Sequence, residues 1–217
     1  MKMNIIPELQ KREEIFLIQF RIKFFFHYNY FLPHKLIFNL SLLHNKSRRF
    51  LEFAESRFSV RKFSEKPVEQ EKIDTLLRAL QIAPTAENKQ PQKIYIITKE
   101  EDRKKLKTVT KYAFNAPMYF LVCCDKNKAW KHNTEEYYST EIDGAISITH
   151  IILEAHDLGL GSVVVRSFET EKLKNLFKIP ENMVPIALLP IGYPKEGVKP
   201  SKWHMQKKDV KELVEYL

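Results

Sequence analysis

The sequence predicts an α+β domain in which helices pack around a mixed sheet. Four short apolar runs have the length and composition of strands, and amphipathic runs with helical spacing lie between them. The run 118–124 is apolar throughout, which indicates a strand buried on both faces. The predicted strands are 93–98, 118–124, 162–166 and 184–193, and the predicted helices are 68–83, 99–111, 141–158, 169–177 and a last one ending at Leu217.

The first half of the chain contains clear helix boundaries. A short amphipathic helix is expected just before Arg57. Pro67 favours a helix that begins at Val68, because proline is tolerated in a first helical turn, and Pro84 marks the end of that helix. The charged segment 99–111 is typical of a helix on the surface.

The second half contains the helix with the broadest apolar face. Residues of segment 141–158 recur at helical spacing, and Gly159 and Gly161 end the helix as a C-cap. The face comprises Ile142, Ala145, Ile146, Thr149, Ile152, Leu153 and His156. Pro185 and Pro190 place the last strand near an edge or a bulge.

The N-terminal residues differ in composition from the rest. The aromatic run 15–26 is interrupted by Arg21 and Lys23, whereas a membrane span needs about 20 apolar residues with few charges. A helix on an anionic membrane surface stays possible. We predict a poorly ordered or loosely packed extension at 1–48 and a folded domain at 49–217.

Composition restricts the classes of function that the protein can have but does not identify one of them. The 217 residues are 44% hydrophobic, and the formal charge of +9 favours anionic partners such as phosphate cofactors, nucleic acid or acidic membranes. Cys123 and Cys124 are neighbours that cannot easily bridge each other, so we expect reduced, buried thiols in a cytoplasmic protein. No nucleophilic triad and no metal-ligand spacing stands out, so we expect neither a side-chain nucleophile nor a metal.

The stretch 57–63 has the pattern of an anion-binding segment. Arg57, Ser59 and Arg61 are spaced by two and would point to one side of an extended segment. Arginine suits phosphate because its guanidinium binds two oxygens at once. A solvated basic face is the alternative. The first of the five glycines is Gly144, so the chain has no clustered glycines for a phosphate loop ahead of it, and side chains must hold a phosphorylated cofactor.

The loop 83–92 offers neutral polar groups. Two prolines bracket small and amide side chains, which indicates a loop. Thr85, Asn88 and Gln90 provide uncharged donors and acceptors, which suit the polar edge of a ring. An ordinary polar turn is the alternative.

Four segments together resemble the FMN-dependent nitroreductase family. The stretch 57–63 resembles its opening motif, and loop 83–92 resembles its flavin-binding loop. Segments 157–162 and 191–194 also resemble family patterns in the same order, so the resemblance runs from about Phe50 to Leu217. It implies a three-layer α-β-α sandwich with a mixed, mainly antiparallel sheet, and a homodimer with FMN at the interface.

The resemblance also implies roles for individual residues. Arg57, Ser59 and Arg61 would hold the phosphate and the ribityl chain, and Lys207 would reach the phosphate. Arg166 and Ser167 would approach the isoalloxazine near N5 and O4. The residues that would lie against the ring from the partner subunit are Pro84, Thr85, Ala86, Asn88 and Gln90.

The implied activity is that of an FMN-dependent oxidoreductase. NAD(P)H would reduce a nitroaromatic, a quinone or a similar acceptor by two-step, ping-pong hydride transfer through flavin N5. The sequence does not choose NADH over NADPH. A flavin store without turnover is an alternative. A basic protein that binds nucleic acid or a membrane surface is less favoured, because the basic residues are dispersed among acids and no nucleic-acid motif is present.

Overall fold

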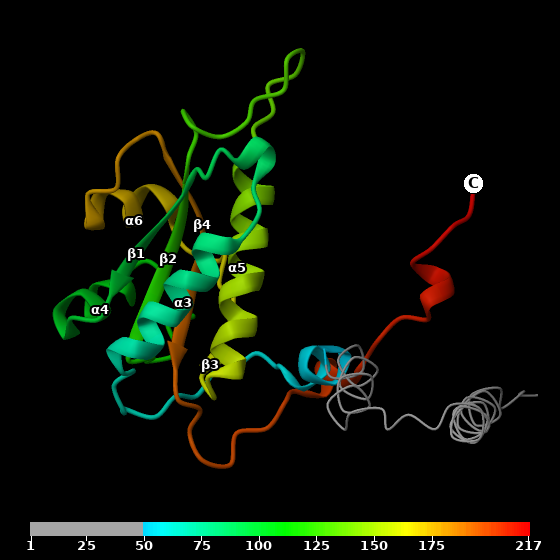
Figure 1. Cartoon of the computed structure of the whole chain (residues 1–217). Coiled ribbons are helices and arrows are strands. Elements are labelled where there is room, and N and C mark those ends of the chain that lie inside the picture. Colours follow the sequence, from blue (N-terminus) through cyan, green and yellow to red (C-terminus); the bar gives the residue numbers. More distant parts are fainter. Residues whose placement is uncertain (1–49) are drawn as a thin grey trace, which may run out of the picture. The chain divides into compact units, whose positions relative to one another are not determined.

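The computed structural model describes residues 50–217, and Phe53–Leu217 forms one compact unit (Figure 1). A helix at 50–56 precedes Arg57, as expected from the sequence. Within residues 50–217, no helix is long and apolar enough to span a membrane. The predicted extension 1–48 lies outside the described residues, and so does its boundary with the domain.

A four-stranded sheet forms the centre of this unit. Its strands are β1 (Gln92–Ile97), β2 (Met118–Asp125), β3 (Gly161–Ser162) and β4 (Met183–Gly192), in the order β1-β2-β4-β3. The three neighbouring pairs are antiparallel. Ser59 forms a parallel bridge to Ser162, which adds the extended segment at Ser59 to the β3 edge of the sheet. The sheet is therefore mixed and mainly antiparallel, as predicted.

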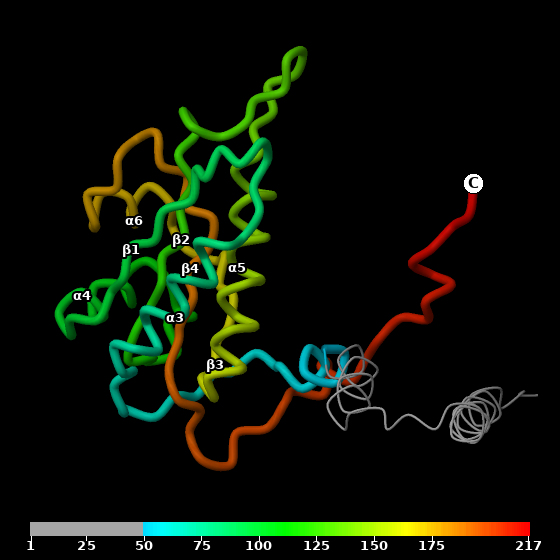
Figure 2. The backbone as a smooth tube through the Cα atoms, in the orientation of Figure 1, coloured from blue at the N-terminus to red at the C-terminus, as the bar shows by residue number. Residues whose placement is uncertain are grey.

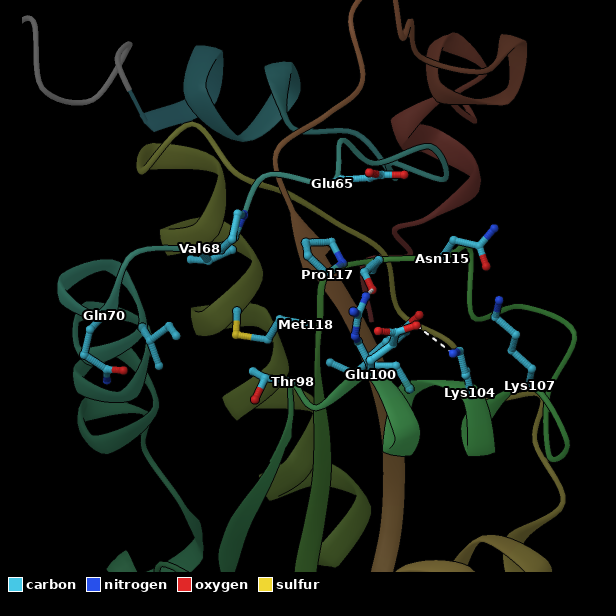
Figure 3. A pocket seen from close by; sticks show the side chains of 15 residues that line it. Glu65, Val68, Gln70, Thr98, Glu100, Lys104, Lys107, Asn115, Pro117 and Met118 are labelled. Carbon is cyan, nitrogen blue, oxygen red and sulfur yellow. Dashed lines mark hydrogen bonds and ion pairs between the residues drawn. The ribbon is translucent and has the colours of Figure 1, made fainter.

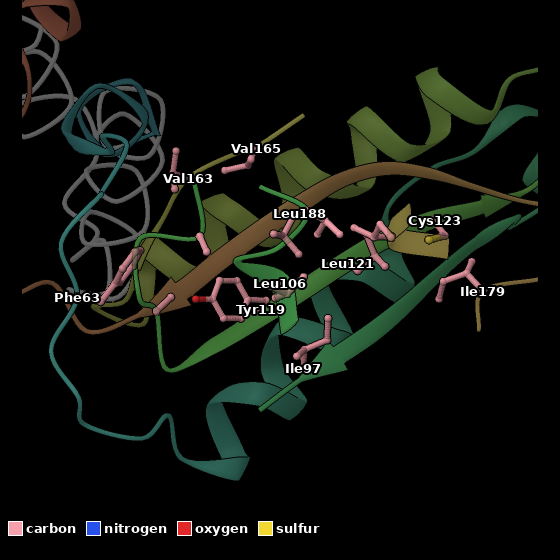
Figure 4. Packing of buried hydrophobic residues seen from close by; sticks show 14 of the residues in the cluster. Phe63, Ile97, Leu106, Tyr119, Leu121, Cys123, Val163, Val165, Ile179 and Leu188 are labelled. Atoms are coloured by element: carbon pink, nitrogen blue, oxygen red, sulfur yellow. The ribbon is translucent and has the colours of Figure 1, made fainter. Parts of the chain in front are cut away.

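Helices cover both faces of the sheet (Figures 1 and 2). Helices α3 (Gln70–Ile82) and α5 (Thr140–Asp157) pack on one face with Met118, Phe120 and Val122 of β2. Residues of α4 (Glu100–Leu106) and α6 (Thr170–Phe177) pack on the other. The alternate β2 residues Tyr119, Leu121 and Cys123 point to that second face, as Figure 4 shows. Period-two alternation of an entirely apolar strand thus builds two cores, and the three-layer sandwich is confirmed.

Three predicted elements are shorter than expected. Helix α4 ends at Leu106, and β3 has only two residues, although Val165 forms a further bridge to Leu188. The apolar residues 163 and 165 are buried without a continuous ladder, so their composition alone overstated the strand. The helix predicted to end at Leu217 is wrong: residues 201–217 contain only the 3₁₀ turns Lys202–Met205 and Val210–Glu212. Short helices depend on a surface to pack against, and every residue from 205 to 217 is exposed.

Pro185 of β4 lies at a bulge and at an open side of the strand. Strand β4 lies between β2 and β3, but β3 pairs with β4 only at Ile191 and Gly192, with one further bridge from Val165 to Leu188, so the expectation of an edge or a bulge holds at Pro185. The register shifts between Val122 and Cys123, whose partners are Ala187 and Pro185, and Ile186 is left without a partner. Helix α5 lies very close to this bulge, because a Cβ on Gly144 would come within 2.8 Å of the Ile186 side chain.

The two cysteines are free and buried in β2. Burial raises the pKa of Cys123 and of Cys124 to about 12. Because the thiolate is the reactive form, we expect neither thiol to react with a maleimide in the native protein at mildly alkaline pH, and both to react after unfolding in urea. Mass spectrometry of the labelled protein checks this, and rapid double labelling of the native protein would contradict it.

Candidate functional site

The stretch 57–63 is an extended segment on the edge of the sheet. The backbone N–H of Val60 donates to the carbonyl of Ser162 at 3.0 Å, beside the Ser59–Ser162 bridge. Val60 is 2% exposed, and Phe58 packs against the same core. Arg57 and Ser59 are partly exposed and Arg61 is exposed. The predicted alternation is therefore confirmed, with apolar anchors inside and polar side chains along the other side.

A glycine allows this segment to lie so close to β3. A Cβ on Gly161 would come within 2.6 Å of the Val60 side chain, a distance that real Cβ atoms essentially never show. Beside this contact is a small cavity of about 190 Å³, lined among others by Arg57, Gly161 and Ser162. The backbone approach thus places the guanidinium of Arg57 at a hollow next to the sheet edge.

The end of α5 supports the same segment. His156 Nε2 lies 2.7 Å from the hydroxyl of Ser56, and its ring centroid lies 5.1 Å from that of Phe53. Burial, with a smaller effect of the nearby Arg57, lowers the pKa of His156. Burial also lowers the pKa of Arg57 from its ordinary value, although arginine stays charged. A partly desolvated guanidinium beside a neutral imidazole favours a bound anion.

The loop after α3 is held by its own polar groups. Thr85 Oγ1 accepts a hydrogen bond from the Gln90 N–H at 3.0 Å, and Gln90 Nε2 donates to Asn88 Oδ1 at 3.0 Å. Glu87, Asn88 and Gln90 have φ angles of 49°, 54° and 48°. Residues other than glycine rarely adopt this left-handed conformation, and such strain concentrates at binding sites. Of the predicted residues here, Pro84, Asn88 and Gln90 are exposed and Thr85 and Ala86 are partly buried.

A buried carboxylate fastens this loop to α5. Asp143 is 1% exposed; its Oδ1 accepts from the Ala86 N–H at 2.9 Å and its Oδ2 accepts from the Ser139 hydroxyl at 2.6 Å. Ser139 Oγ accepts in turn from the Trp130 N–H at 3.1 Å. Sequence reasoning missed Asp143, because an acid in a first helical turn usually favours the helix dipole from the surface. No local signal in the sequence distinguished its side of the helix from the apolar side that contains Ile142.

The two predicted halves of the site lie at opposite ends of α5. The loop is attached at Asp143, whereas the helix that leads into Arg57 contacts His156. Thirteen residue steps along a helix span roughly 20 Å. Figure 1 shows this length of α5 between them. One chain therefore does not bring the loop and the arginine-bearing stretch together.

The remaining predicted residues lie on the side of the arginine-bearing stretch. Arg166 and Ser167 follow the Val165–Leu188 bridge on the β3 edge and are exposed. The guanidinium of Arg166 stacks over Phe168 at 5.0 Å from the ring centroid. Lys207 is exposed and comes three residues after His204, whose ring lies 2.9 Å from the Glu55 carbonyl. Within residues 50–217, no hydrogen bond or ion pair joins these side chains to Arg57.

One face of α5 is open in the single chain. The residues buried against the sheet include Asp143, Ser147, Ile151 and Ala155, whereas Ile142 is 54% exposed and Ala145 and Thr149 are exposed as well. Of the apolar face expected from the sequence, Ile142, Ala145 and Thr149 form this open side, whereas the others are partly buried, namely Ile146, Ile152, Leu153 and His156. The C-terminal segment likewise exposes apolar side chains, namely Trp203, Met205, Val210, Leu213 and Tyr216.

The fold and the edge segment define the nitroreductase class of α-β-α proteins, and comparison with known proteins agrees. A model of the Nitroreductase family matches residues 54–115 and 110–193. The chain is 30% identical over 171 residues to a protein of Methanothermobacter thermautotrophicus that is provisionally named an NADH dehydrogenase/NAD(P)H nitroreductase; the match covers 72% of this chain and 86% of that protein.

Solved structures give the same result. A nitroreductase family protein from Clostridium difficile 630 superposes with a TM-score of 0.71 and 35% identity, over 76% of this chain and 96% of that one. An FMN-dependent nitroreductase from Clostridium difficile R20291 superposes with a TM-score of 0.57 and 26% identity, over 69% and 90% of the two chains. This chain belongs to the nitroreductase family.

Proposed function

We propose that this protein is an FMN-dependent oxidoreductase that uses NAD(P)H to reduce nitroaromatics, quinones or similar acceptors. The observation that carries the proposal is the extended stretch on the β3 edge, where Arg57, Ser59 and Arg61 lie along the side away from the core. Family membership supports the activity. The name of the Methanothermobacter relative includes NAD(P)H nitroreductase, and the structure from Clostridium difficile R20291 is named an FMN-dependent nitroreductase.

The donor set of the edge segment fits FMN. Two guanidiniums and a hydroxyl suit a phosphate and the ribityl chain next to it. Arg166 and Ser167 continue along the same edge, where the ring would lie, and Lys207 would approach the phosphate. Bound FMN supplies a hydride acceptor and donor at N5 between the nicotinamide and the final acceptor. The chain itself binds and orients, and positive charge near the ring stabilises negative charge that develops there.

We propose further that the site is completed in a homodimer, with loop 84–90 supplied by the partner. The roughly 20 Å between the two half-sites supports this arrangement. The exposed Ile142 and Ala145 of α5 and the exposed apolar side chains of the C-terminal segment support it too, because exposed apolar surface is common at interfaces. A cytoplasmic location also stays a proposal, which the two free thiols support.

The purified protein provides the first test. We expect a yellow protein with flavin absorbance, which NADH or NADPH bleaches in the absence of oxygen and a nitroaromatic or quinone restores. A coloured protein that neither nicotinamide bleaches would be a flavin store. A colourless protein that does not take up FMN would overturn both functions. Assays of a panel of nitroaromatics and quinones, each with NADH and with NADPH, then show which combination of nicotinamide and acceptor the enzyme prefers.

Substitution of one edge arginine tests the phosphate assignment. We expect Arg61→Ala to weaken FMN binding roughly 10- to 100-fold, because a charge-assisted hydrogen bond contributes about 1.5–3 kcal/mol. Arg61 is exposed, so the fold should not change. The adjacent, exposed Lys62 provides the matched control: Lys62→Ala removes the same charge, and its FMN affinity should stay near that of the parent protein. Fluorescence titration of the apoprotein with FMN measures both. Equal affinities of the two variants would refute the assignment.

A further inference from the structure

A second cavity lies at the end of the sheet where β1 ends and β2 begins. It has a volume of about 810 Å³ and is lined by the start of α3, the end of β1, the start of β2 and α4, as Figure 3 shows. None of the residues predicted to bind FMN lines it. The nearby strands β1 and β2 are separated from the β3 edge by β4. A ligand in this cavity would therefore contact none of the residues predicted to bind FMN.

The base of this cavity is apolar. Ile73 of α3 and Met118 and Tyr119 of β2 are buried side chains that line it, and Val68 and Pro117 are partly buried beside them. Ile73 and Met118 belong to one core cluster, and Tyr119 belongs to the other. Such a surface suits the hydrocarbon part of a small molecule, since sites of this kind combine apolar walls with a few polar groups.

One wall is cationic. Helix α4 contributes Arg103 and Lys104, of which Lys104 pairs with Glu100 at 2.6 Å, and Lys107 follows directly after the helix. Lys107 has no ion pair within residues 50–217. In Figure 3 the other acid, Glu65, lies at the upper rim of the cavity, and Lys104 and Lys107 lie at the lower right. Lys104, and to a smaller extent Arg103, lowers the pKa of Glu100, so this carboxylate offsets part of the positive charge of the wall. Lys107 remains unpaired there among the described residues.

Arg103 provides part of an anion-binding site. Its Nη1 donates to the Ala116 carbonyl over a long 3.4 Å, and its Nε is buried and has no partner in the described part of the chain. A guanidinium carries five donors, and a buried donor without an acceptor is costly. The bond to Ala116 fixes one side of the group at the cavity wall. An oxyanion in the cavity would be bound by the terminal Nη groups, because the buried Nε has no surface open to the cavity.

The rim of the cavity is strained at one point. Phe114 and Asn115 both have left-handed backbones, with φ angles of 55° and 52°. Two consecutive non-glycine residues in this conformation are unusual. The turn carries Asn115 to the cavity wall, where its amide is exposed. Figure 3 shows this side chain on the same side as Lys107, so it adds a polar group next to the cationic wall.

We propose that this cavity binds a small organic anion, an aryl or alkyl carboxylate. Its hydrocarbon part packs against Ile73, Met118 and Tyr119, and its carboxylate accepts hydrogen bonds from Arg103 and a salt bridge from Lys107. The apolar base and the cationic wall together select for a molecule with both parts. The site stands apart from the proposed flavin chemistry and does not depend on it.

A matched pair of probes tests the proposal. Phenylbutyrate and phenylbutanol share their hydrocarbon part, and only the first carries a charge. Isothermal titration of the purified protein, as isolated, should give a dissociation constant for phenylbutyrate at least roughly tenfold below that for phenylbutanol. Arg103→Gln and Lys107→Gln should each weaken phenylbutyrate binding and leave the weak phenylbutanol binding unchanged.

Two controls keep the result specific to this cavity. Arg78→Gln removes an exposed arginine from α3 that does not line the cavity, and Arg61→Ala removes one from the edge segment. Both should bind phenylbutyrate as the parent protein does. Lys107 is exposed, so Lys107→Gln remains informative even if Arg103→Gln fails to fold. Equal affinity for acid and alcohol, no binding of either, or loss of binding with Arg61→Ala rather than Arg103→Gln would overturn the proposal.

Discussion

Ala145→Arg is expected to produce a folded monomer that does not retain FMN. Ala145 is exposed on the open face of α5, so an arginine there disturbs no contact within the described chain, and both residues are strong helix formers. In a two-fold dimer the same patch is used twice, so the charge enters the interface from both chains. Burial of unpaired charges at an interface costs several kcal/mol.

The loss of FMN follows from the distance between the half-sites. Without the partner, the edge segment keeps its arginines but lacks the loop that would face the ring, because its own loop lies at the other end of α5. We expect FMN affinity to fall at least roughly 100-fold, equivalent to about 3 kcal/mol. Light scattering during size-exclusion chromatography gives the mass, circular dichroism gives the fold, and absorbance gives the flavin content.

Asn175→Arg provides the matched control for this change. Asn175 is exposed on α6, on the opposite face of the sheet, so the same charge enters a helix away from the proposed interface. This variant should stay dimeric and yellow. A monomeric Ala145→Arg protein that binds FMN as tightly as the parent would show that one chain completes the site. A dimeric Ala145→Arg protein would place the interface elsewhere.

The layered fold was predictable because most strands are buried on both faces. A continuous apolar run such as 118–124 has few alternatives, and period-two alternation then assigns Tyr119 and Phe120 to different cores. The C-terminal segment was not predictable in this way. Its apolar residues have helical composition, but Trp203 and Leu213 remain 68% and 65% exposed, and a helix needs a surface that this chain alone does not provide.

The chemistry of the candidate site was easier to predict than its geometry. The spacing of Arg57, Ser59 and Arg61 determines which side each takes once the segment is extended, and Val60 confirms that alternation. The helical spacing of α5 identified an apolar face but did not indicate which of two faces packs on the sheet. That choice depends on Gly144, which allows the helix to approach the bulge at Ile186. Such long-range fits have no local signal in the sequence.

Asp143→Asn is expected to weaken FMN binding roughly tenfold and to lower the melting temperature, although Asp143 touches neither the stretch 57–63 nor loop residues beyond Ala86. The carboxylate accepts from the Ala86 N–H and from the Ser139 hydroxyl at the same time. An asparagine of the same shape has only one oxygen. One of these buried donors then lacks its acceptor, at a cost of about 1–3 kcal/mol.

The effect should reach two loops together. Ser139 also accepts from Trp130, and Trp130 packs edge-on against the ring of Tyr137 at 6.3 Å. Asp143 is thus a positioning residue that joins the proposed flavin loop to the aromatic segment 130–138. Hydrogen exchange should increase at both loops in Asp143→Asn. The melting temperature should fall by about 2–4 °C for each kcal/mol lost.

Glu141→Gln separates positioning from charge. Glu141 lies in the same first turn of α5 and is exposed, so this variant removes an equal charge from the helix N-terminus without breaking a buried hydrogen bond. We expect its FMN affinity, melting temperature and exchange rates to match those of the parent protein. If Glu141→Gln and Asp143→Asn behave alike, the helix dipole rather than the link to Ala86 and Ser139 accounts for the effect. If exchange rises at only one loop, Asp143 does not couple the two.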